Sequence, residues 1–357
     1  MAIKKPLADY ISSLYGLFDP SGKFGFPAGK KYLKLLLKNH SQQSNASDTT
    51  EYGWWTIQKH LFLHSYLQPF FAIGSKYFRR IVYIDMFAGP GLNLIRKGKD
   101  SFPSPGSPLV AYAYKYIPKK GGRTERFDSY YFFEKDPLKA QILESRLNQI
   151  ASDFHYEEKP RVIHNDSSSS IWSVMNAEVE FLSQPKKTNV RPDQGLLFLI
   201  FIDPEGLELN WDVLSKLIKR YIANNEDGGT NGHYTVADII YTIPIGGLKR
   251  EDKGHFERTF GIKDVDPANR DPEEIIEFIY KQMKKEVGGG IYFRGVPVRN
   301  TKNVLLYDIS LITKTEGTDK AFQWITKKFT KLKLDPEQIE NGINILLGKS
   351  ATLDAFS

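Results

Sequence analysis

Four carboxylates each follow a short apolar segment that is typical of a buried strand. They are Asp85, Glu134, Asp166 and Asp203. A single acid after a strand is usually a helix cap, but four in succession make a more specific pattern. Ligands of an open α/β sheet bind at the carboxyl ends of its strands, so we expect a ligand site formed by these residues.

The first of these acids is joined to a glycine turn. Ile81–Ile84 is an apolar run, Asp85 follows it, and Gly89 and Gly91 come shortly after. Glycines let the backbone approach a ligand closely. A dinucleotide site would need a third glycine where Leu94 stands, and no Lys-Ser/Thr pair of a phosphate-binding loop follows. A sulfonium cofactor, S-adenosylmethionine (SAM), fits better than a phosphate ligand, because carboxylates favour its positive charge. The alternative is an ordinary tight turn.

Composition narrows the classes of protein further. The chain has 357 residues, 41% of them hydrophobic, and a net charge of +7, which favours a polyanionic partner. It has no cysteine, which excludes disulfides, thiolate metal sites and cysteine nucleophiles. No apolar run reaches the roughly 18 residues of a membrane span. The first nine residues lack the apolar segment of a secretion signal, so we expect a cytoplasmic protein.

The order of elements predicts an α/β fold with a mostly parallel, Rossmann-like sheet of about seven strands. Strands are expected over 81–84, 128–133, 161–164, 196–202, 236–243 and 304–313. We expect four segments: an N-terminal helical extension (1–80), a cofactor-binding core (81–243), a substrate-side helical insertion (244–300), and the last strand or strands of the core with C-terminal helices (301–357).

The extension is expected to contain a helix over 54–71. Lys59, His60 and His64 lie opposite its apolar stripe, as a solvated face or a ligand contact. No third ligand accompanies the histidines, so a metal site is not favoured. Residues 41–50 are polar and predict a mobile loop.

Residues 93–106 are expected to be a long loop, because Pro103 and Pro105 bar a helix. Such a loop is either a lid over a site or a surface insertion. A helix should follow, with Ser107 as N-cap and Pro108 at the first helical position.

The insertion is basic. One interpretation is a surface that contacts substrate phosphates, and the other is a solvated helix of mixed charge. The candidate contacts are Lys249, Arg250, Lys281, Lys284 and Lys285.

Four segments resemble a known family, the three-Cys-motif partner (TcmP) proteins. They are residues 83–91 (Tyr-Ile-Asp-Met-Phe-Ala-Gly-Pro-Gly), 106–109 (Gly-Ser-Pro-Leu), 133–134 (Phe-Glu) and 201–208 (Phe-Ile-Asp-Pro-Glu-Gly-Leu-Glu). The resemblance spans roughly residues 50–330 and implies a class I methyltransferase fold, with a partner protein that carries three cysteines.

The general class I pattern implies roles for individual residues. Asp85, Phe87, Ala88, Gly89 and Gly91 would flank the methionine end of SAM, and Ser107 would belong to the cofactor site. Glu134 would hold the ribose, and Asp166 and Ser167 would lie by the adenine.

Asp203, Pro204 and Glu205 occupy the place where amino-directed nucleic-acid methyltransferases carry Asp-Pro-Pro-Tyr. Only Asp-Pro matches, and the aromatic residue that stacks on a flipped base is missing.

We therefore expect a SAM-dependent methyltransferase acting on N or O of a nucleic acid. Asp203 would accept a hydrogen bond from the acceptor, and Glu205 would assist as base. Two other hypotheses stay open: a non-catalytic SAM-binding interaction protein, and a metal-dependent nuclease built on the four acids. If Asp203 acts only on the acceptor, Asp203→Asn should leave stability nearly unchanged.

Overall fold

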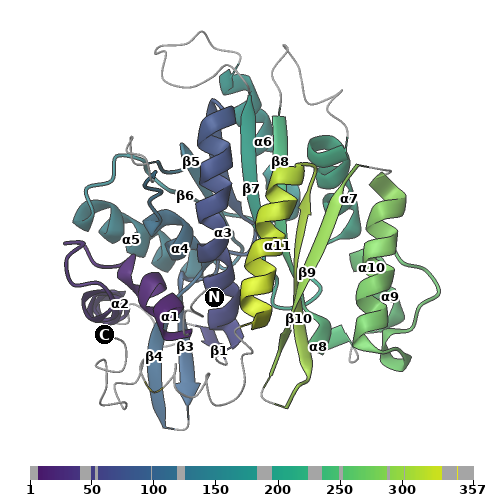
Figure 1. The fold of residues 1–357 in the computed structure, drawn as a ribbon, viewed down its shortest axis with the longest axis horizontal. Helices are drawn as coiled ribbons and strands as arrows, with labels where there is room; N and C mark the ends of the chain where they lie inside the picture. Colours follow the sequence, from purple (N-terminus) through teal and green to yellow (C-terminus); the bar gives the residue numbers. More distant parts are fainter. Residues whose placement is uncertain are drawn as a thin grey trace.

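The computed structural model describes residues 7–40, 50–52, 55–97, 99–118, 125–182, 195–223, 235–248, 252–287, 290–300, 302–331 and 344. At its centre is a seven-stranded sheet with helices on both faces (Figure 1). In spatial order the strands are β6 (Arg161–His164), β5 (Ser129–Glu134), β2 (Arg80–Asp85), β7 (Leu196–Ile202), β8 (Thr235–Ile243), β10 (Leu305–Thr313) and β9 (Tyr292–Arg299).

The direction of the strands confirms the Rossmann-like arrangement. β6, β5, β2, β7 and β8 are parallel, while β10 is antiparallel to both β8 and β9. From β2 the chain first builds toward β6 and then continues on the other side with β7. The strand order thus reverses between β2 and β7, which is where ligands of such sheets bind.

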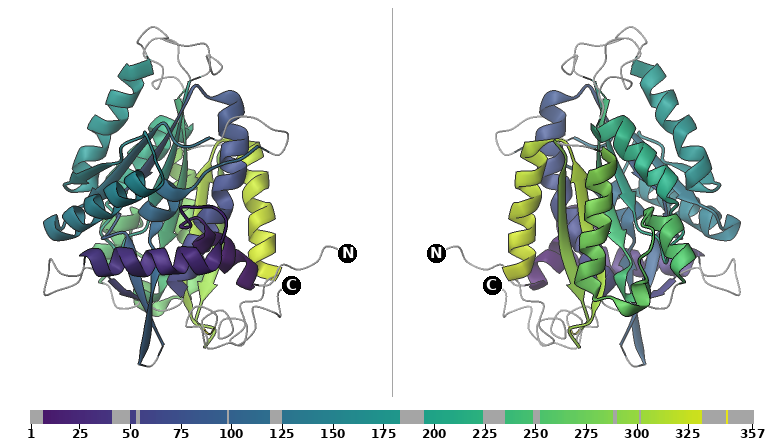
Figure 2. Two further views of the ribbon diagram at one scale, coloured as in Figure 1. Left: turned by 90° about the vertical axis from the view of Figure 1, so that its left-hand side faces the viewer. Right: turned by 90° about the vertical axis from the view of Figure 1, so that its right-hand side faces the viewer.

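The apolar strands form two cores because successive side chains point to opposite faces of the sheet. Ile81 and Tyr83 belong to one core, and Val82 and Ile84 to the other. Figure 2 shows the sheet edge-on between its two helical layers. The first core contains α1 (Leu7–Gly16), α2 (Phe26–His40), α3 (Trp55–Tyr77), α4 (Ser107–Ala113), α5 (Pro137–Asp153) and α11 (Glu316–Lys331). The second contains α6 (Ser167–Leu182), α7 (Trp211–Ile218) with its continuation η2 (Lys219–Ala223), α8 (Ile245–Leu248), α9 (Lys253–Phe260) and α10 (Pro272–Val287).

The expectation of a long loop over 93–106 is wrong. β3 (Leu92–Lys97) and β4 (Asp100–Pro105) form an antiparallel hairpin, and β1 (Thr50–Tyr52) pairs with β3 in a small separate sheet. Pro103 and Pro105 exclude a helix but are tolerated here, because β4 is an edge strand that needs few ladder N–H donors. The predicted mobile loop over 41–50 falls outside the described residues, except for Thr50 in β1.

Residues 244–300 do not stand apart from the core. They contain α8, α9, a short 3₁₀ turn η3 (Pro267–Asn269), α10 and then β9, which is the edge strand of the main sheet. This segment is therefore a long crossover connection from β8 to β9, rather than an insertion outside the sheet. No described helix is both long enough and apolar enough to cross a bilayer.

Candidate functional site

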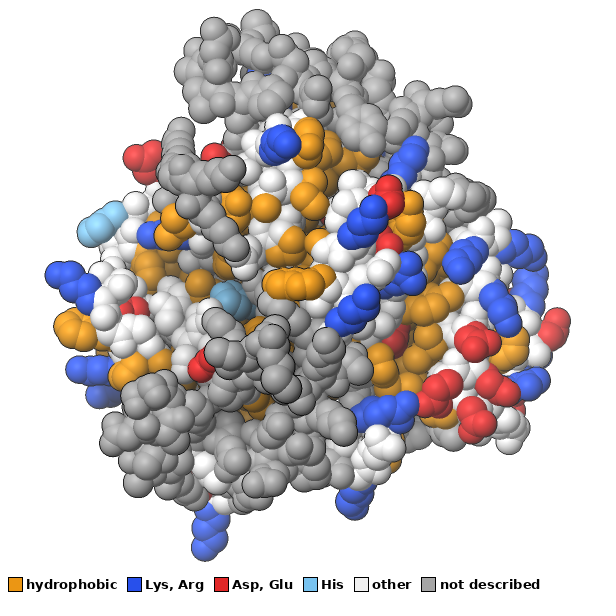
Figure 3. Space-filling view, in the orientation of Figure 1, with side chains coloured by type: hydrophobic (Ala, Val, Ile, Leu, Met, Phe, Trp, Pro, Cys, Tyr) orange, Lys and Arg blue, Asp and Glu red, His pale blue; other side chains and the backbone are white. Residues whose placement is uncertain are grey.

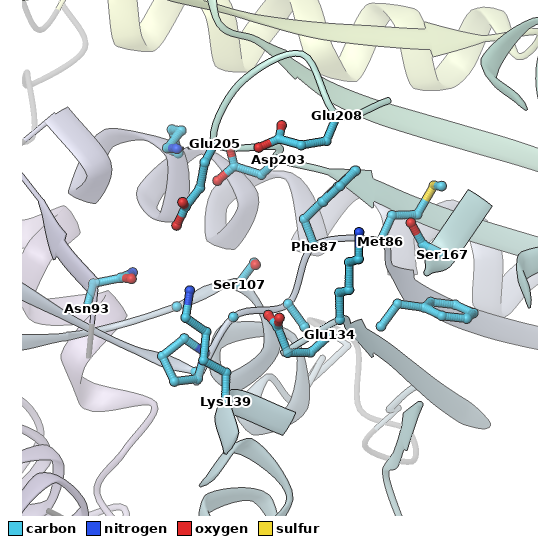
Figure 4. A pocket seen from close by; sticks show the side chains of 18 of the residues that line it. Met86, Phe87, Asn93, Ser107, Glu134, Lys139, Ser167, Asp203, Glu205 and Glu208 are labelled. Atoms are coloured by element: carbon cyan, nitrogen blue, oxygen red, sulfur yellow. Dashed lines mark hydrogen bonds and ion pairs between the residues drawn. The ribbon is translucent and has the colours of Figure 1, made fainter. Parts of the chain in front are cut away.

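A cavity of about 460 Å³ lies at the carboxyl ends of the strands, beside the reversal of strand order between β2 and β7. Figure 4 shows Asp203, Glu205 and Glu208 together on one side of it and Glu134 with Lys139 across from them. Its wall consists of residues from α3, the glycine turn, β3, the start of α4, the ends of β5 and β6, and the loop after β7. They are Thr56, Lys59, His60, Met86, Phe87, Ala88, Gly89, Pro90, Gly91, Asn93, Gly106, Ser107, Phe133, Glu134, Lys135, Lys139, Asn165, Asp166, Ser167, Asp203, Glu205 and Glu208.

The glycine turn is held in a conformation that favours glycine. Gly89 has φ +60° and Gly91 has φ +83°, the left-handed region that L side chains rarely adopt. At Gly91 an added Cβ would lie 2.8 Å from Leu143 Cδ1, whereas at Gly89 nothing lies within 4 Å. The turn is therefore shaped by its backbone at both glycines and by close packing at Gly91 alone.

Neighbouring elements fix this turn from three sides. The Met86 amide donates to the Phe201 carbonyl at 3.0 Å, and the Ala88 amide donates to the Phe133 carbonyl at 2.9 Å. From α5, the fully buried Arg146 donates through Nη1 to the Pro90 carbonyl at 2.7 Å. The backbone that faces the cavity is therefore preorganised.

Asp85 lies beneath the turn and does not line the cavity, in contrast to the role that the class I pattern implied. Its carboxyl group is fully buried and accepts hydrogen bonds from the Phe87 amide, the Tyr83 hydroxyl and the Ser107 hydroxyl. Burial raises its pKa to about 7, against the effect of these three donors. Its observed contacts anchor the turn.

Ser107 does not cap its helix as expected. Gly106 occupies the N-cap position without a side-chain cap, and α4 begins at Ser107. The Ser107 hydroxyl bonds to Asp85 instead. Ser107 therefore joins the wall of the cavity to the anchor beneath the turn.

The ends of β5 and β6 form another wall. The Glu134 carboxylate accepts from the Asp136 amide at 2.8 Å, and the Asp136 side chain caps the amino end of α5. Asp166 accepts from the Ser168 amide at 2.8 Å, immediately before α6. Both acids therefore stabilise a turn and also border the cavity, as does Ser167.

Asp203 is held by an ion pair that the sequence did not indicate. Lys59 Nζ on α3 lies 2.8 Å from Asp203 Oδ1, and the two side chains are 6% and 12% exposed. The same ammonium lies 4.5 Å from the centroid of the Tyr307 ring on β10. Asp203→Asn would leave Lys59 with a weaker partner, so the structure leads us to expect a loss of stability in place of the nearly unchanged stability predicted from the sequence.

The expected solvated face of α3 is also wrong. Lys59 and His60 are buried, and His64 is half-buried, because other helices and the sheet surround α3. Burial lowers the pKa of His60 to about 3 and that of His64 to about 4, so both are neutral at physiological pH. The surviving alternative is a ligand contact, since Thr56, Lys59 and His60 line the cavity.

Several of the predicted catalytic and substrate-binding residues lie elsewhere. Pro204 is buried and absent from the cavity wall, although Asp203 and Glu205 on either side line it. Lys249 and Arg250 fall outside the described residues. Lys281, Lys284 and Lys285 are exposed, but they lie in the second half of α10.

The position of α10 separates these three lysines from the cavity. β8 and β9 run parallel, since both are antiparallel to β10, and α10 connects the carboxyl end of β8 to the amino end of β9. The last turns of α10 therefore lie at the amino ends of the parallel strands, whereas the cavity lies at their carboxyl ends. Glu273 and Glu274 lie in its first turn and Lys284 and Lys285 in its last, a distribution that stabilises the helix macrodipole. Figure 3 shows this face with acidic side chains gathered below the basic ones.

Sequence reasoning missed Thr56, Asn93, Lys135, Lys139 and Glu208 as wall residues. For Thr56 the available signal was its spacing from Lys59 and His60 on one helix, which places all three near one another. Asn93 reaches the cavity through the unforeseen hairpin. Among the described residues, no group of three or more His, Asp or Glu is arranged to hold a metal ion.

No protein-family model matches the sequence. No curated protein matches it either.

Solved structures show a distant likeness. One is a protein of family DUF519 from Legionella pneumophila, at 13% identity, with 78% of this chain and 92% of that chain covered and a TM-score of 0.45. Another is an O-methyltransferase from Bacillus cereus in complex with S-adenosylhomocysteine, at 12% identity, with 79% of this chain and 90% of that chain covered and a TM-score of 0.37. A third is the O-methyltransferase TomG from Streptomyces achromogenes in complex with SAM, at 13% identity, with 79% of this chain and 89% of that chain covered and a TM-score of 0.34. With TM-scores this low, none of them decides the function of this chain.

Proposed function

We propose that this protein is a SAM-dependent methyltransferase. The observation that carries the proposal is the cavity at the reversal of strand order, with the glycine turn on one side and Glu134 at the end of the neighbouring strand. Its volume of about 460 Å³ is within the range of about 300–1,000 Å³ for small-molecule sites. The wall offers carboxylates and backbone groups, and its described residues include no phosphate-binding loop.

Each part of the wall has a task in this proposal. The turn at Gly89 and Gly91 lets the methionine end approach the backbone, Glu134 accepts from the ribose hydroxyls, and Asp166 with Ser167 borders the adenine. When bound, SAM supplies a methyl carbon that forms a bond to the lone pair of a nucleophile while the sulfur keeps the electrons of the broken bond. Asp203 then orients the acceptor, and its contact with Lys59 holds the carboxylate in one position.

Calorimetry with SAM and S-adenosylhomocysteine tests the cofactor site. Glu134→Ala should weaken both by roughly 1–3 kcal/mol, the scale of a lost hydrogen bond to a charged group. Asp136→Ala is the matched control, since it removes the cap of α5 without removing a proposed ribose contact. ATP and NAD⁺ serve as phosphate-bearing probes and should not bind. If neither SAM nor S-adenosylhomocysteine binds at millimolar concentration, the proposal is wrong.

For the acceptor, we propose N or O of a nucleic acid, either DNA or RNA. The net charge of +7 and the position of Lys135 and Lys139 at the cavity support a polyanionic substrate. Labelled SAM incubated separately with cellular DNA, RNA and protein would identify the class. Transfer to protein alone would contradict this proposal.

We further propose membership of the TcmP family and a partner protein with three cysteines. The support is that all four resembling segments contribute residues to the wall of one cavity. These segments are 83–91, 106–109, 133–134 and 201–208.

The alternative is a non-catalytic SAM-binding protein. Two observations favour it. One is the tight pairing of Asp203 with Lys59, and the other is that Glu205 and Gly206 stand where the second proline and the base-stacking aromatic would be. Cofactor binding without transfer to any cellular fraction would support it.

A further inference from the structure

The side of the cavity between α3 and the loop after β7 differs chemically from the side at β5 and β6. Asp203, Glu205 and Glu208 border the side at α3. Among the described wall residues, Lys59 is the one lysine on this side, whereas Lys135 and Lys139 follow β5. Lys59 pairs with Asp203 through Oδ1, and Glu208 accepts from the Gly206 amide through Oε2 at 2.8 Å. This side therefore presents hydrogen-bond acceptors and a negative field.

Two buried polar atoms on α3 border the same space. Thr56 Oγ1 and His60 Nδ1 have no hydrogen-bond partner within the described part of the chain, and each residue is 2% exposed. Buried polar groups are nearly always satisfied, so an unpartnered pair in a cavity wall points to a ligand. His60 is neutral because burial lowers its pKa to about 3, so it offers hydrogen bonding without positive charge.

We propose that this side of the cavity is the acceptor subsite and takes a nitrogen acceptor, an amine whose N–H groups donate to Asp203. The inference rests on the proposed function and deepens it. An acceptor that enters as a carboxylate, a phosphate or a phenolate would add a negative charge beside three carboxylates. An amine instead places a donor at the Asp203 carboxylate and its body against Thr56 and His60.

The proton balance follows from this placement. The lone pair of the nitrogen forms the new bond to carbon, so the nitrogen must release one proton. Asp203 is the wall carboxylate placed to receive it, and the proton then passes to water. Lys59 stays paired with Oδ1, so the proposal assigns the acceptor to the other carboxylate oxygen.

Sinefungin tests this without knowledge of the substrate, because it carries an amine where SAM carries the methylsulfonium group. The measured quantity is the ratio of the dissociation constants of S-adenosylhomocysteine and sinefungin, from calorimetry on the full chain. We expect sinefungin to bind the wild-type protein at least about tenfold more tightly, and Asp203→Asn to reduce that preference about tenfold. SAM carries a positive charge at the same position but no N–H there, so it separates charge attraction from hydrogen bonding. The preference for SAM over S-adenosylhomocysteine should fall less in Asp203→Asn.

Glu134→Gln is the matched control. It lies at the ribose side, so it should weaken all three nucleosides alike and leave the ratio unchanged. Glu205→Gln, at an exposed position, is the second acidic variant and should lower the ratio by a smaller factor. It keeps the test decisive if Asp203→Asn does not fold.

The outcomes distinguish the inference from the proposed function. If none of the nucleosides binds, the proposed function fails. If S-adenosylhomocysteine binds but sinefungin is not preferred, or if the preference survives both acidic variants, the nitrogen subsite is wrong while the cofactor site stands. An equal fall of the ratio in Glu134→Gln would also overturn it.

Discussion

Lys59 Nζ and Asp203 Oδ1 lie 2.8 Å apart although 144 positions separate the two residues in the chain. The contact joins α3, before the first strand of the main sheet, to the loop that follows β7. It couples the N-terminal helices to the candidate reaction centre, and both side chains are nearly buried.

Lys59→Met should lower the free energy of unfolding by about 2–4 kcal/mol, because it leaves the Asp203 carboxylate without its ion-pair partner. This range is somewhat lower than the about 3–5 kcal/mol for breaking a fully buried pair, because Asp203 borders the cavity. Urea denaturation measures it. Lys76→Met is the control: Lys76 is an exposed lysine in the last turn of the same helix, so its loss should cost only about 0.3–1 kcal/mol through the helix macrodipole. Similar effects of the two variants would show that the pair contributes nothing specific.

Gly91→Ala should destabilise the protein more than Gly89→Ala. Both impose a left-handed conformation on a residue with a Cβ, at about 1–2 kcal/mol. Only Gly91 adds a contact, 2.8 Å to Leu143 Cδ1, which should cost about 1–3 kcal/mol more. Denaturation curves give the stabilities, and calorimetry with S-adenosylhomocysteine shows whether the affinity falls in parallel. Equal losses would mean that the packing around Gly91 relaxes freely.

Asp85→Asn should change how stability depends on pH. Burial raises the folded-state pKa of Asp85 to about 7, above the ordinary value of about 3.9 for an aspartate side chain. Between these pH values the folded state binds more protons than the unfolded state, so ionisation of Asp85 lowers stability as the pH rises. The stability difference, wild type minus variant, should therefore fall by about 1.4 kcal/mol per pH unit between pH 4 and 7.

The variant comparison is needed because other groups oppose this trend. The pKa of His60 is lowered to about 3 and that of His64 to about 4, so they contribute stability above pH 6.5 that is lost as the pH falls toward those values. Asp238→Asn is the control carboxylate. Burial raises the pKa of Asp238 to about 6. The pH range over which the stability difference for Asp238→Asn falls should therefore end about one pH unit lower than that for Asp85→Asn. A pH-independent difference for Asp85→Asn would contradict the assignment.

Charge reversal at Lys281, Lys284 and Lys285 should leave the affinity for S-adenosylhomocysteine unchanged, because the last turns of α10 lie at the edge opposite the cavity. It should lower stability by about 0.3–1 kcal/mol for each lysine in the last turn, through the helix macrodipole. If these lysines contact nucleic acid, the salt slope of binding should fall by about one unit per lost phosphate contact. An unchanged slope would remove α10 from the binding surface.

Local sequence determined much of the fold. The apolar run Leu196–Ile202 predicted a buried strand and forms one. Asp136 and Asn210 cap the helices that follow them because their short side chains accept from free amides. The acids after strands and the glycines after Asp85 also indicated the edge of the sheet where the cavity lies, since parallel strands end at the same edge.

Only the tertiary structure decided which of these residues reach the cavity. Asp85 belongs to the strand-end pattern, yet it lies beneath the turn, because Tyr83, Phe87 and Ser107 all donate to it there. Lys59 belongs to a helix that would ordinarily expose its polar face, but helices and sheet enclose it and bring its ammonium to Asp203. Periodicity describes one element at a time, whereas burial and ion pairing depend on which elements pack together.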